Sequence, residues 1–224
     1  MQTQTRFWSR LGVLGGVYAV LFVIASVLLG EPGSGTGGAA VVAYYRGHQT
    51  AETVGVFAVA FAVVALTFFL ASLRRALSGT DEGRALAVVV TVGGAVYAAG
   101  LMTMTALTVA LIDAARDNLP GTAQALNVLG SDLWPPVVVG LALLGLGTGV
   151  AALRSGALPG WLGWVSVAFG VLALAGPAGG IAFLVAPGWA LALGIVIMRS
   201  PRAAAALADP AAQDAPQQAA TGSR

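Results

Sequence analysis

Long apolar blocks without charged residues recur along this chain and limit what it can fold into. The first runs from Leu11 to Leu29, close to the roughly 20 residues that a helix needs to cross about 30 Å of hydrocarbon. Of the 224 residues, 58% are hydrophobic and 9% are charged, whereas a soluble domain carries roughly 25% charged residues. Such a chain cannot cover itself with a polar surface, so we expect an all-α polytopic membrane protein folded as one bundle.

The apolar blocks predict six transmembrane helices. Four of them cover residues 8–29, 53–73, 85–112 and 133–153. The last block, residues 161–198, would measure about 57 Å as one helix, which is too long for one crossing. The sequence GPAGG at residues 176–180 would divide it into spans 161–175 and 181–198, and APG at residues 186–188 is a second candidate break. Either break gives a six-helix transmembrane domain within residues 1–199.

The arginines predict the orientation of these spans. With a cytoplasmic N-terminus, six spans place nine arginines on the cytoplasmic side and only Arg46 and Arg116 outside. This distribution agrees with the positive-inside rule, whereas five spans would give six arginines against five. We therefore expect a multi-pass protein of a bacterial cytoplasmic membrane with both termini in the cytoplasm.

The two ends of the chain carry further expectations. The start resembles a signal peptide, but its apolar run is longer than that of a cleavable one, so we expect an uncleaved first span. Residues 200–224 consist largely of Ala, Pro and Gln, a composition that predicts a disordered cytoplasmic tail.

The centres of the predicted spans contain no Asp, Glu, Lys, Arg or His. Ion-coupled transporters, proton pumps and voltage sensors usually keep ionisable groups at that depth. The chain has no cysteine, and its single histidine is His48, so thiol catalysis and clustered histidine sites are excluded. We therefore predict no enzyme activity, no catalytic residue, no metal site and no cofactor. The scattered arginines form no stripe that would bind nucleic acid.

Polar residues gather in the two predicted outer loops. They suggest a polar or ligand-binding cluster on the outer face, made of Tyr44, Tyr45, Arg46, His48, Asp113, Asp117 and Asp132. Asp113 and Asp117 lie one helical turn apart and could share a cation, but no calcium-loop pattern surrounds them. Salt bridges between Arg46 and one of the aspartates are the favoured interpretation. Asp132, shortly before two prolines, predicts a capped helix start.

The stretch VVAYYRGHQTAE at residues 41–52 predicts a short helix between spans one and two. Val41, Val42 and Tyr45 would form its apolar face, with Arg46 toward water. Such a helix would lie on the outer membrane surface and turn into span two. A ligand or partner site is the alternative interpretation.

Small and hydroxylated residues predict how the helices pack. The pairs Gly12/Gly16, Gly145/Gly149 and Gly176/Gly180 fit the small-xxx-small pattern of close helix contacts. Thr105 and Asp113 lie near one face of span three and could line a polar path. The favoured interpretation is that the threonine hydroxyls of this span bond carbonyls of their own helix.

The motifs VVAYYRGHQ before span two and LPGWLGW at the start of span five carry a resemblance. The chain resembles a large group of uncharacterised actinobacterial membrane proteins, usually filed under domains of unknown function. The likeness covers roughly residues 7–199 and rests on the order of the segments and on these motifs. The resemblance implies a six-span fold and supplies no catalytic residues.

Two functions remain open from the sequence. The favoured one is a non-enzymatic structural or partner-binding membrane subunit, because the spans lack charge and are rich in small residues. The alternative is a binder or carrier of a lipid-like or apolar small molecule, held in a cavity between spans three to six. The expected partners are membrane lipids and either further copies of the chain or another membrane protein. A lipid-sized cavity would favour the binder, and a fully packed interior would remove it.

Overall fold

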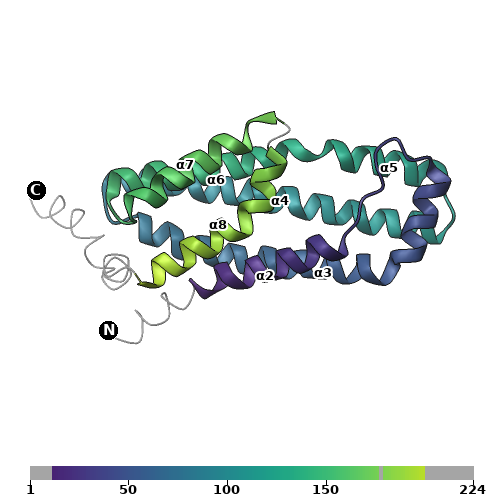
Figure 1. The fold of residues 1–224 in the computed structure, drawn as a ribbon, viewed down its shortest axis with the longest axis horizontal. Helices are drawn as coiled ribbons and strands as arrows, with labels where there is room; N and C mark the ends of the chain where they lie inside the picture. Colours follow the sequence, from purple (N-terminus) through teal and green to yellow (C-terminus); the bar gives the residue numbers. More distant parts are fainter. Residues whose placement is uncertain (1–11, 177–178, 200–224) are drawn as a thin grey trace, which may run out of the picture.

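The computed structural model describes residues 12–176 and 179–199, and its regular structure is helical (Figure 1). The all-α prediction is confirmed. The predicted tail at 200–224 and the first residues of the predicted first span lie outside the described residues. The helices, in chain order, are α2 (Val13–Leu28), α3 (Gly38–Leu77), α4 (Asp81–Arg116), α5 (Pro120–Asp132), α6 (Trp134–Ser155), α7 (Gly160–Ala173) and α8 (Gly179–Arg199).

Four helical stretches are long and apolar enough to cross a membrane, namely Gly38–Leu77, Asp81–Arg116, Pro120–Ser155 and Gly179–Arg199. The apolar helices α2 and α7 are shorter, with 16 and 14 residues, which correspond to about 24 Å and 21 Å. Helix α7 ends at Ala173 and α8 begins at Gly179, at the first of the two candidate breaks, and Pro187 lies inside α8. This set of helices is that of a membrane-embedded protein.

Large apolar side chains cover the outside of the bundle. Phe57, Phe61 and Phe68 of α3 are each more than half exposed, as are Trp161 and Trp164 of α7. In water such a surface would cause the protein to associate with other molecules, whereas in a bilayer the apolar side chains contact lipid hydrocarbon. One end of the bundle is rich in arginine, and we call it the arginine end. It contains Arg74, Arg75, Arg84, Arg154 and Arg199. Helix α5 marks the opposite end, the α5 end (Figure 1).

Glycines bring α6 into direct backbone contact with two neighbours. A methyl group on Gly93 of α4 would lie 2.6 Å from the backbone nitrogen of Leu144, and one on Gly145 would lie 2.8 Å from Gly170 of α7. Gly145 and Gly149 therefore pack closely, as their spacing predicts. The prediction of a close helix contact at Gly176/Gly180 is wrong. Gly176 forms a turn with φ +61°, and nothing in the described structure lies within 4 Å of a methyl group on Gly180.

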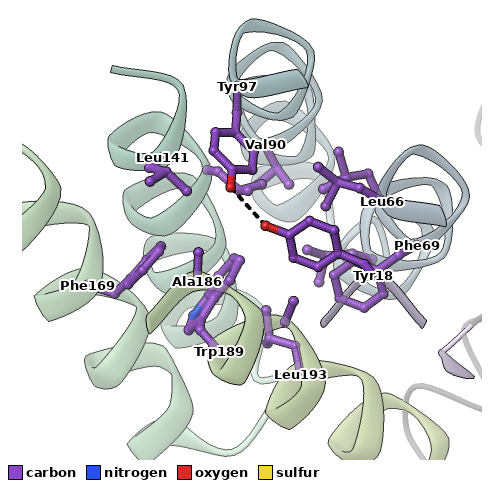
Figure 2. Close-up of a cluster of buried hydrophobic side chains, with 14 of the residues drawn as sticks. Tyr18, Leu66, Phe69, Val90, Tyr97, Leu141, Phe169, Ala186, Trp189 and Leu193 are labelled. Atoms are coloured by element: carbon purple, nitrogen blue, oxygen red, sulfur yellow. Dashed lines mark hydrogen bonds between the residues drawn. The ribbon is translucent and has the colours of Figure 1, made fainter. Parts of the chain in front are cut away.

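Helix α2 is joined to α4 by a pair of buried tyrosines. Helix α2 packs against α3 and α8, and its Tyr18 hydroxyl lies 2.8 Å from the hydroxyl of Tyr97 on α4. Both side chains are about 1% exposed. Figure 2 shows this hydrogen bond among apolar side chains that include Leu66, Phe69 and Val90. Each hydroxyl is thus the partner that keeps the other from being buried unpaired.

The predicted separate surface helix at residues 41–52 is wrong. This stretch belongs to α3, a single helix of 40 residues, because no proline interrupts it. In Figure 1 its first turns cross the α5 end before the helix follows the long axis of the bundle. Val41, Val42 and Tyr45 do form one apolar face, but it packs in a cluster with residues of α4 and α5 such as Ile112 and Ala123.

We predict that the two tyrosine hydroxyls are energetically coupled. Replacing either one with phenylalanine leaves its partner buried without a hydrogen bond, which costs about 1–3 kcal/mol. The double variant Tyr18→Phe/Tyr97→Phe removes both hydroxyls, so its loss of unfolding free energy should be smaller than the sum of the two single losses. Unfolding by sodium dodecyl sulfate in mixed micelles measures all three. Simple additivity would show that the hydrogen bond contributes nothing.

Candidate functional site

A cavity of about 560 Å³ lies toward the α5 end, between α4 on one side and α2 and α8 on the other. Its volume falls within the roughly 300–1,000 Å³ of typical ligand sites. Most of its lining is apolar. The side chains and glycines that shape its walls and its polar end include Phe22, Glu31, Tyr45, Leu101, Met104, Thr105, Thr108, Asn127, Gly130, Trp134, Gly180 and Phe183.

Large side chains build the walls of the cavity. Phe183 of α8 stands edge-on to Phe22 of α2 and to Trp134 of α6, with ring centroids 4.9 Å and 5.1 Å apart. Across from them, α4 presents Leu101 and Thr105, one turn apart on the face that meets the cavity. These rings separate the helices here, whereas glycines draw α4 and α6 together. The result is an apolar chamber with space for an acyl-like chain.

Asn127 of α5 belongs to the cavity lining, and its amide oxygen is buried without a partner in the described structure. The residue is 1% exposed, and its Nδ2 donates to the carbonyls of Pro32 and Gly33 at 3.2 Å and 3.3 Å. Those two acceptors fix the orientation of the amide, because exchanging the oxygen and nitrogen would place oxygen against oxygen. The Oδ1 atom has no hydrogen-bond partner within the described part of the chain. Asn127 was not among the site residues predicted from the sequence.

The threonines of α4 that reach the cavity donate their protons elsewhere. Thr105 Oγ1 donates to the Leu101 carbonyl at 2.8 Å, and Thr108 Oγ1 donates to the Met104 carbonyl at 3.2 Å. The favoured interpretation of the threonine pattern is therefore confirmed. Toward the cavity both oxygens offer lone pairs rather than protons.

Glu31 contributes a carboxyl group at the rim of the cavity. It lies in the loop that joins α2 to α3. Partial burial raises the pKa of this carboxyl above its usual range, because removal from water disfavours the charged form. Among the described residues that line the cavity, none is an arginine or histidine that would offset its charge.

Glu52, which is not part of the cavity lining, links the same loop to α3. Its side chain is fully buried, and Oε1 accepts hydrogen bonds from the Gly30 backbone N–H at 3.0 Å and from the Tyr44 hydroxyl at 3.2 Å. Glu52 is the last residue of the stretch that the sequence predicted as a surface helix. Its burial follows from α3 continuing through this position.

The predicted outer-face cluster is divided between two structural roles. Tyr44 stacks on His48 with ring centroids 4.4 Å apart, and Tyr45 is buried and lines the cavity. Arg46 does not pair with an aspartate in the described structure, contrary to the favoured interpretation. Its Nε donates to the Ala115 carbonyl at 2.8 Å, where it satisfies a free acceptor at the C-terminal end of α4.

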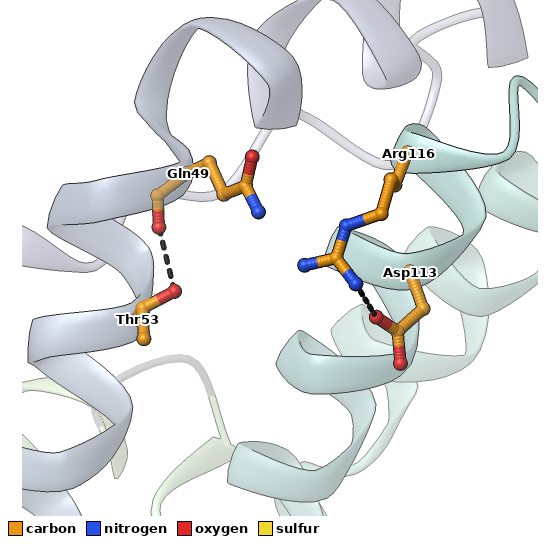
Figure 3. A network of polar contacts seen from close by, with 4 residues as sticks. All are labelled: Gln49, Thr53, Asp113 and Arg116. Atoms are coloured by element: carbon orange, nitrogen blue, oxygen red, sulfur yellow. Dashed lines mark hydrogen bonds and ion pairs between the residues drawn. The ribbon is translucent and has the colours of Figure 1, made fainter.

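The three aspartates of the predicted cluster do not converge on one site. Asp113 pairs with Arg116 of its own helix at 3.2 Å, Asp117 is the C-cap of α4, and Asp132 is the last residue of α5. Figure 3 shows that the Asp113–Arg116 contact and the Gln49–Thr53 contact each stay within one helix. Asp132 does not cap α6, whose N-cap is Leu133, although a proline does occupy its first turn.

No family model, no curated protein and no solved structure matches this chain. Membership in the actinobacterial group therefore stays a prediction. Among the described residues, no three His, Cys, Asp or Glu side chains gather as a candidate metal site. The cavity itself is accordingly the feature from which a function can be inferred.

We predict that Glu52 acts as a hydrogen-bond acceptor rather than as a charge. Glu52→Gln keeps a carbonyl for Gly30 and Tyr44, so its unfolding free energy should equal or exceed that of the wild type. Glu52→Leu leaves both donors unpaired and should lose about 1–3 kcal/mol. Equal losses in the two variants, measured by unfolding in mixed micelles, would show instead that the charge is required.

Proposed function

We propose that this protein is a non-enzymatic membrane protein that binds a lipid-like or apolar small molecule in the cavity beside α4. The observation that carries the proposal is the cavity of about 560 Å³ with apolar walls and polar groups at one end. The sequence alone favoured a structural or partner-binding subunit. A fully packed interior would have supported that function. An apolar pocket of this size offers an apolar molecule a large surface to pack against.

The ligand would enter from the bilayer rather than from water. The helices that frame the cavity, α2, α4 and α8, carry exposed apolar residues such as Val27, Met102 and Leu184. A molecule already dissolved in lipid reaches these helices without crossing a polar surface. Membrane lipids or lipid-soluble metabolites are therefore the class of ligand that the surroundings favour.

We further propose that the arginine end faces the cytoplasm, which places the cavity in the outer half of the membrane. Five of the described arginines lie at the arginine end, whereas Arg46 and Arg116 lie at the α5 end. This distribution supports the positive-inside orientation. With six spans, of which α2 and α7 would be short, both termini would be cytoplasmic in a bacterial inner membrane.

The cavity can be tested by filling it. Thr108→Phe places a ring in the chamber, whereas Thr103→Phe changes the same helix at an exposed threonine outside the lining. In phosphatidylcholine nanodiscs, ω-bromoundecanol should quench tryptophan fluorescence saturably, because Trp134 lines the cavity and bromine quenches only at short range. We expect the Thr108→Phe variant to bind at least tenfold more weakly and the Thr103→Phe variant to bind like the wild type.

Two results would contradict this proposal. One is quenching by the wild type that rises only with the amount of probe in the bilayer. The other is a saturable component that persists in Trp134→Phe and in Thr108→Phe alike, since such binding would occur elsewhere on the protein.

The orientation can be tested with single cysteines, because the chain contains none of its own. Thr122→Cys lies on an exposed position of α5, and Gly79→Cys lies in the turn between α3 and α4. A membrane-impermeant maleimide should label the first in intact cells and the second only after permeabilisation. The reverse pattern would overturn the proposed orientation.

A further inference from the structure

The hydroxyl groups of the cavity lining differ in whether their protons are already used. Ser26 Oγ donates to the Phe22 carbonyl at 2.8 Å, and the hydroxyls of Thr105 and Thr108 donate to carbonyls of α4. The remaining hydroxyl of the lining is that of Tyr45, which makes no hydrogen bond in the described structure. Tyr45 is therefore the hydroxyl of the lining that keeps a proton to donate.

The Tyr45 hydroxyl is accessible although the residue as a whole is only 3% exposed. In the described structure, the unpaired side-chain oxygens that are sealed from solvent are those of Glu52, Asn127 and Thr148. The Tyr45 oxygen is unpaired but is not one of these, so it borders open space, and the open space beside this residue is the cavity. Its ring packs in the apolar cluster with Ile112 and other residues of α4 and α5.

An apolar occupant alone would not satisfy this hydroxyl. A hydrocarbon chain displaces water from the cavity, and a polar group that loses water without gaining a partner is costly. A ligand oxygen placed at the end of the Tyr45 side chain would accept the free proton. Because the ring is already packed in place, little side-chain freedom is lost when this hydrogen bond forms.

Glu31 disfavours a negatively charged acceptor at the same position. This carboxyl lies at the rim of the cavity, and it acts electrostatically on the Tyr45 hydroxyl. Among the described residues of the lining, no arginine or histidine offsets its charge. A carboxylate or phosphate next to Tyr45 would therefore be repelled, whereas a neutral carbonyl or hydroxyl oxygen would not.

Resting on the proposed function, we infer that the ligand is an uncharged amphiphile whose carbonyl or hydroxyl oxygen accepts a hydrogen bond from the Tyr45 hydroxyl. Lipids that present an ester, ketone or alcohol group belong to this class, and free fatty acids do not. The apolar part of the ligand would extend from Tyr45 along Phe22, Leu101 and Phe183.

The test compares three probes that share an ω-bromoalkyl chain of equal length: a methyl ketone, a carboxylate and the plain alkane. Nanodiscs of ether-linked phosphatidylcholine hold the protein, because these lipids have no ester carbonyl to compete for Tyr45. Protein-free nanodiscs correct each probe for partitioning into lipid. From saturable tryptophan quenching, we expect the ketone to bind about three- to tenfold more tightly than the alkane, which is the range for one neutral hydrogen bond.

Two substitutions show whether Tyr45 is the donor. Tyr45→Phe removes a hydroxyl that has no partner in the described structure, so this variant should be as stable as the wild type. It should bind the ketone and the alkane equally tightly, with alkane binding unchanged. Tyr97→Phe makes the same chemical change outside the cavity lining and should keep the preference for the ketone. A preference for the ketone that persists in Tyr45→Phe would overturn the inference.

A further variant tests the exclusion of charge. In the wild type the carboxylate should bind more weakly than the ketone, and Glu31→Gln should reduce this difference. A carboxylate that binds the wild type as tightly as the ketone would overturn the conclusion that the ligand is uncharged.

The outcomes separate this inference from the proposed function. Saturable quenching with equal dissociation constants for the ketone and the alkane in the wild type would overturn the inference and leave the cavity as a site for apolar chains. Absence of saturable quenching by any probe would remove both.

Discussion

Direct backbone contact between α4 and α6 is the constraint on which the rest of the structure depends. In a bilayer the helices gain little from burying apolar surface, so close packing of small residues holds them together. Gly93 and Gly100 of α4 and Gly140 of α6 supply that contact, and a side chain at any of them would collide with the facing helix. Toward the α5 end, α4 carries larger residues at the cavity, such as Leu101 and Met104. There α2 and α8 cannot approach closely, and the cavity is the space that remains.

The α5 end turns this space into a site. Three segments meet there: the loop after α2, the first turns of α3, and α5. Two buried polar side chains hold them together, since Asn127 bonds the carbonyls of Pro32 and Gly33 and Glu52 bonds the N–H of Gly30. Both side chains keep one oxygen without a partner in the described structure. Of the two, Asn127 belongs to the cavity lining and Glu52 does not.

Much of the architecture could be predicted from the sequence, because the length and apolarity of a segment decide whether it can be a membrane helix. Residues that depend on contacts between distant segments could not be placed. Helix α5 was not predicted, because its sequence PGTAQALNVLGSD is too polar for a membrane span. The sequence features that indicate a helix here are Pro120 in the first turn and the spacing of Ala123 and Asn127. Arg46 and its carbonyl partner are 69 residues apart, so charge pairing with an aspartate was the reasonable expectation. The burial of Glu52 could not be predicted, because glutamate is almost never fully buried.

The central claim is that one amphiphile occupies the cavity of each chain. Native mass spectrometry of the protein released from mild detergent after extraction from membranes tests it most directly. We predict a single adduct of lipid-like mass on the wild-type chain, lost when Thr108 is replaced by phenylalanine and retained when Thr103 is replaced. A wild-type chain that always appears without an adduct, or adducts equally abundant on all three proteins, would contradict it.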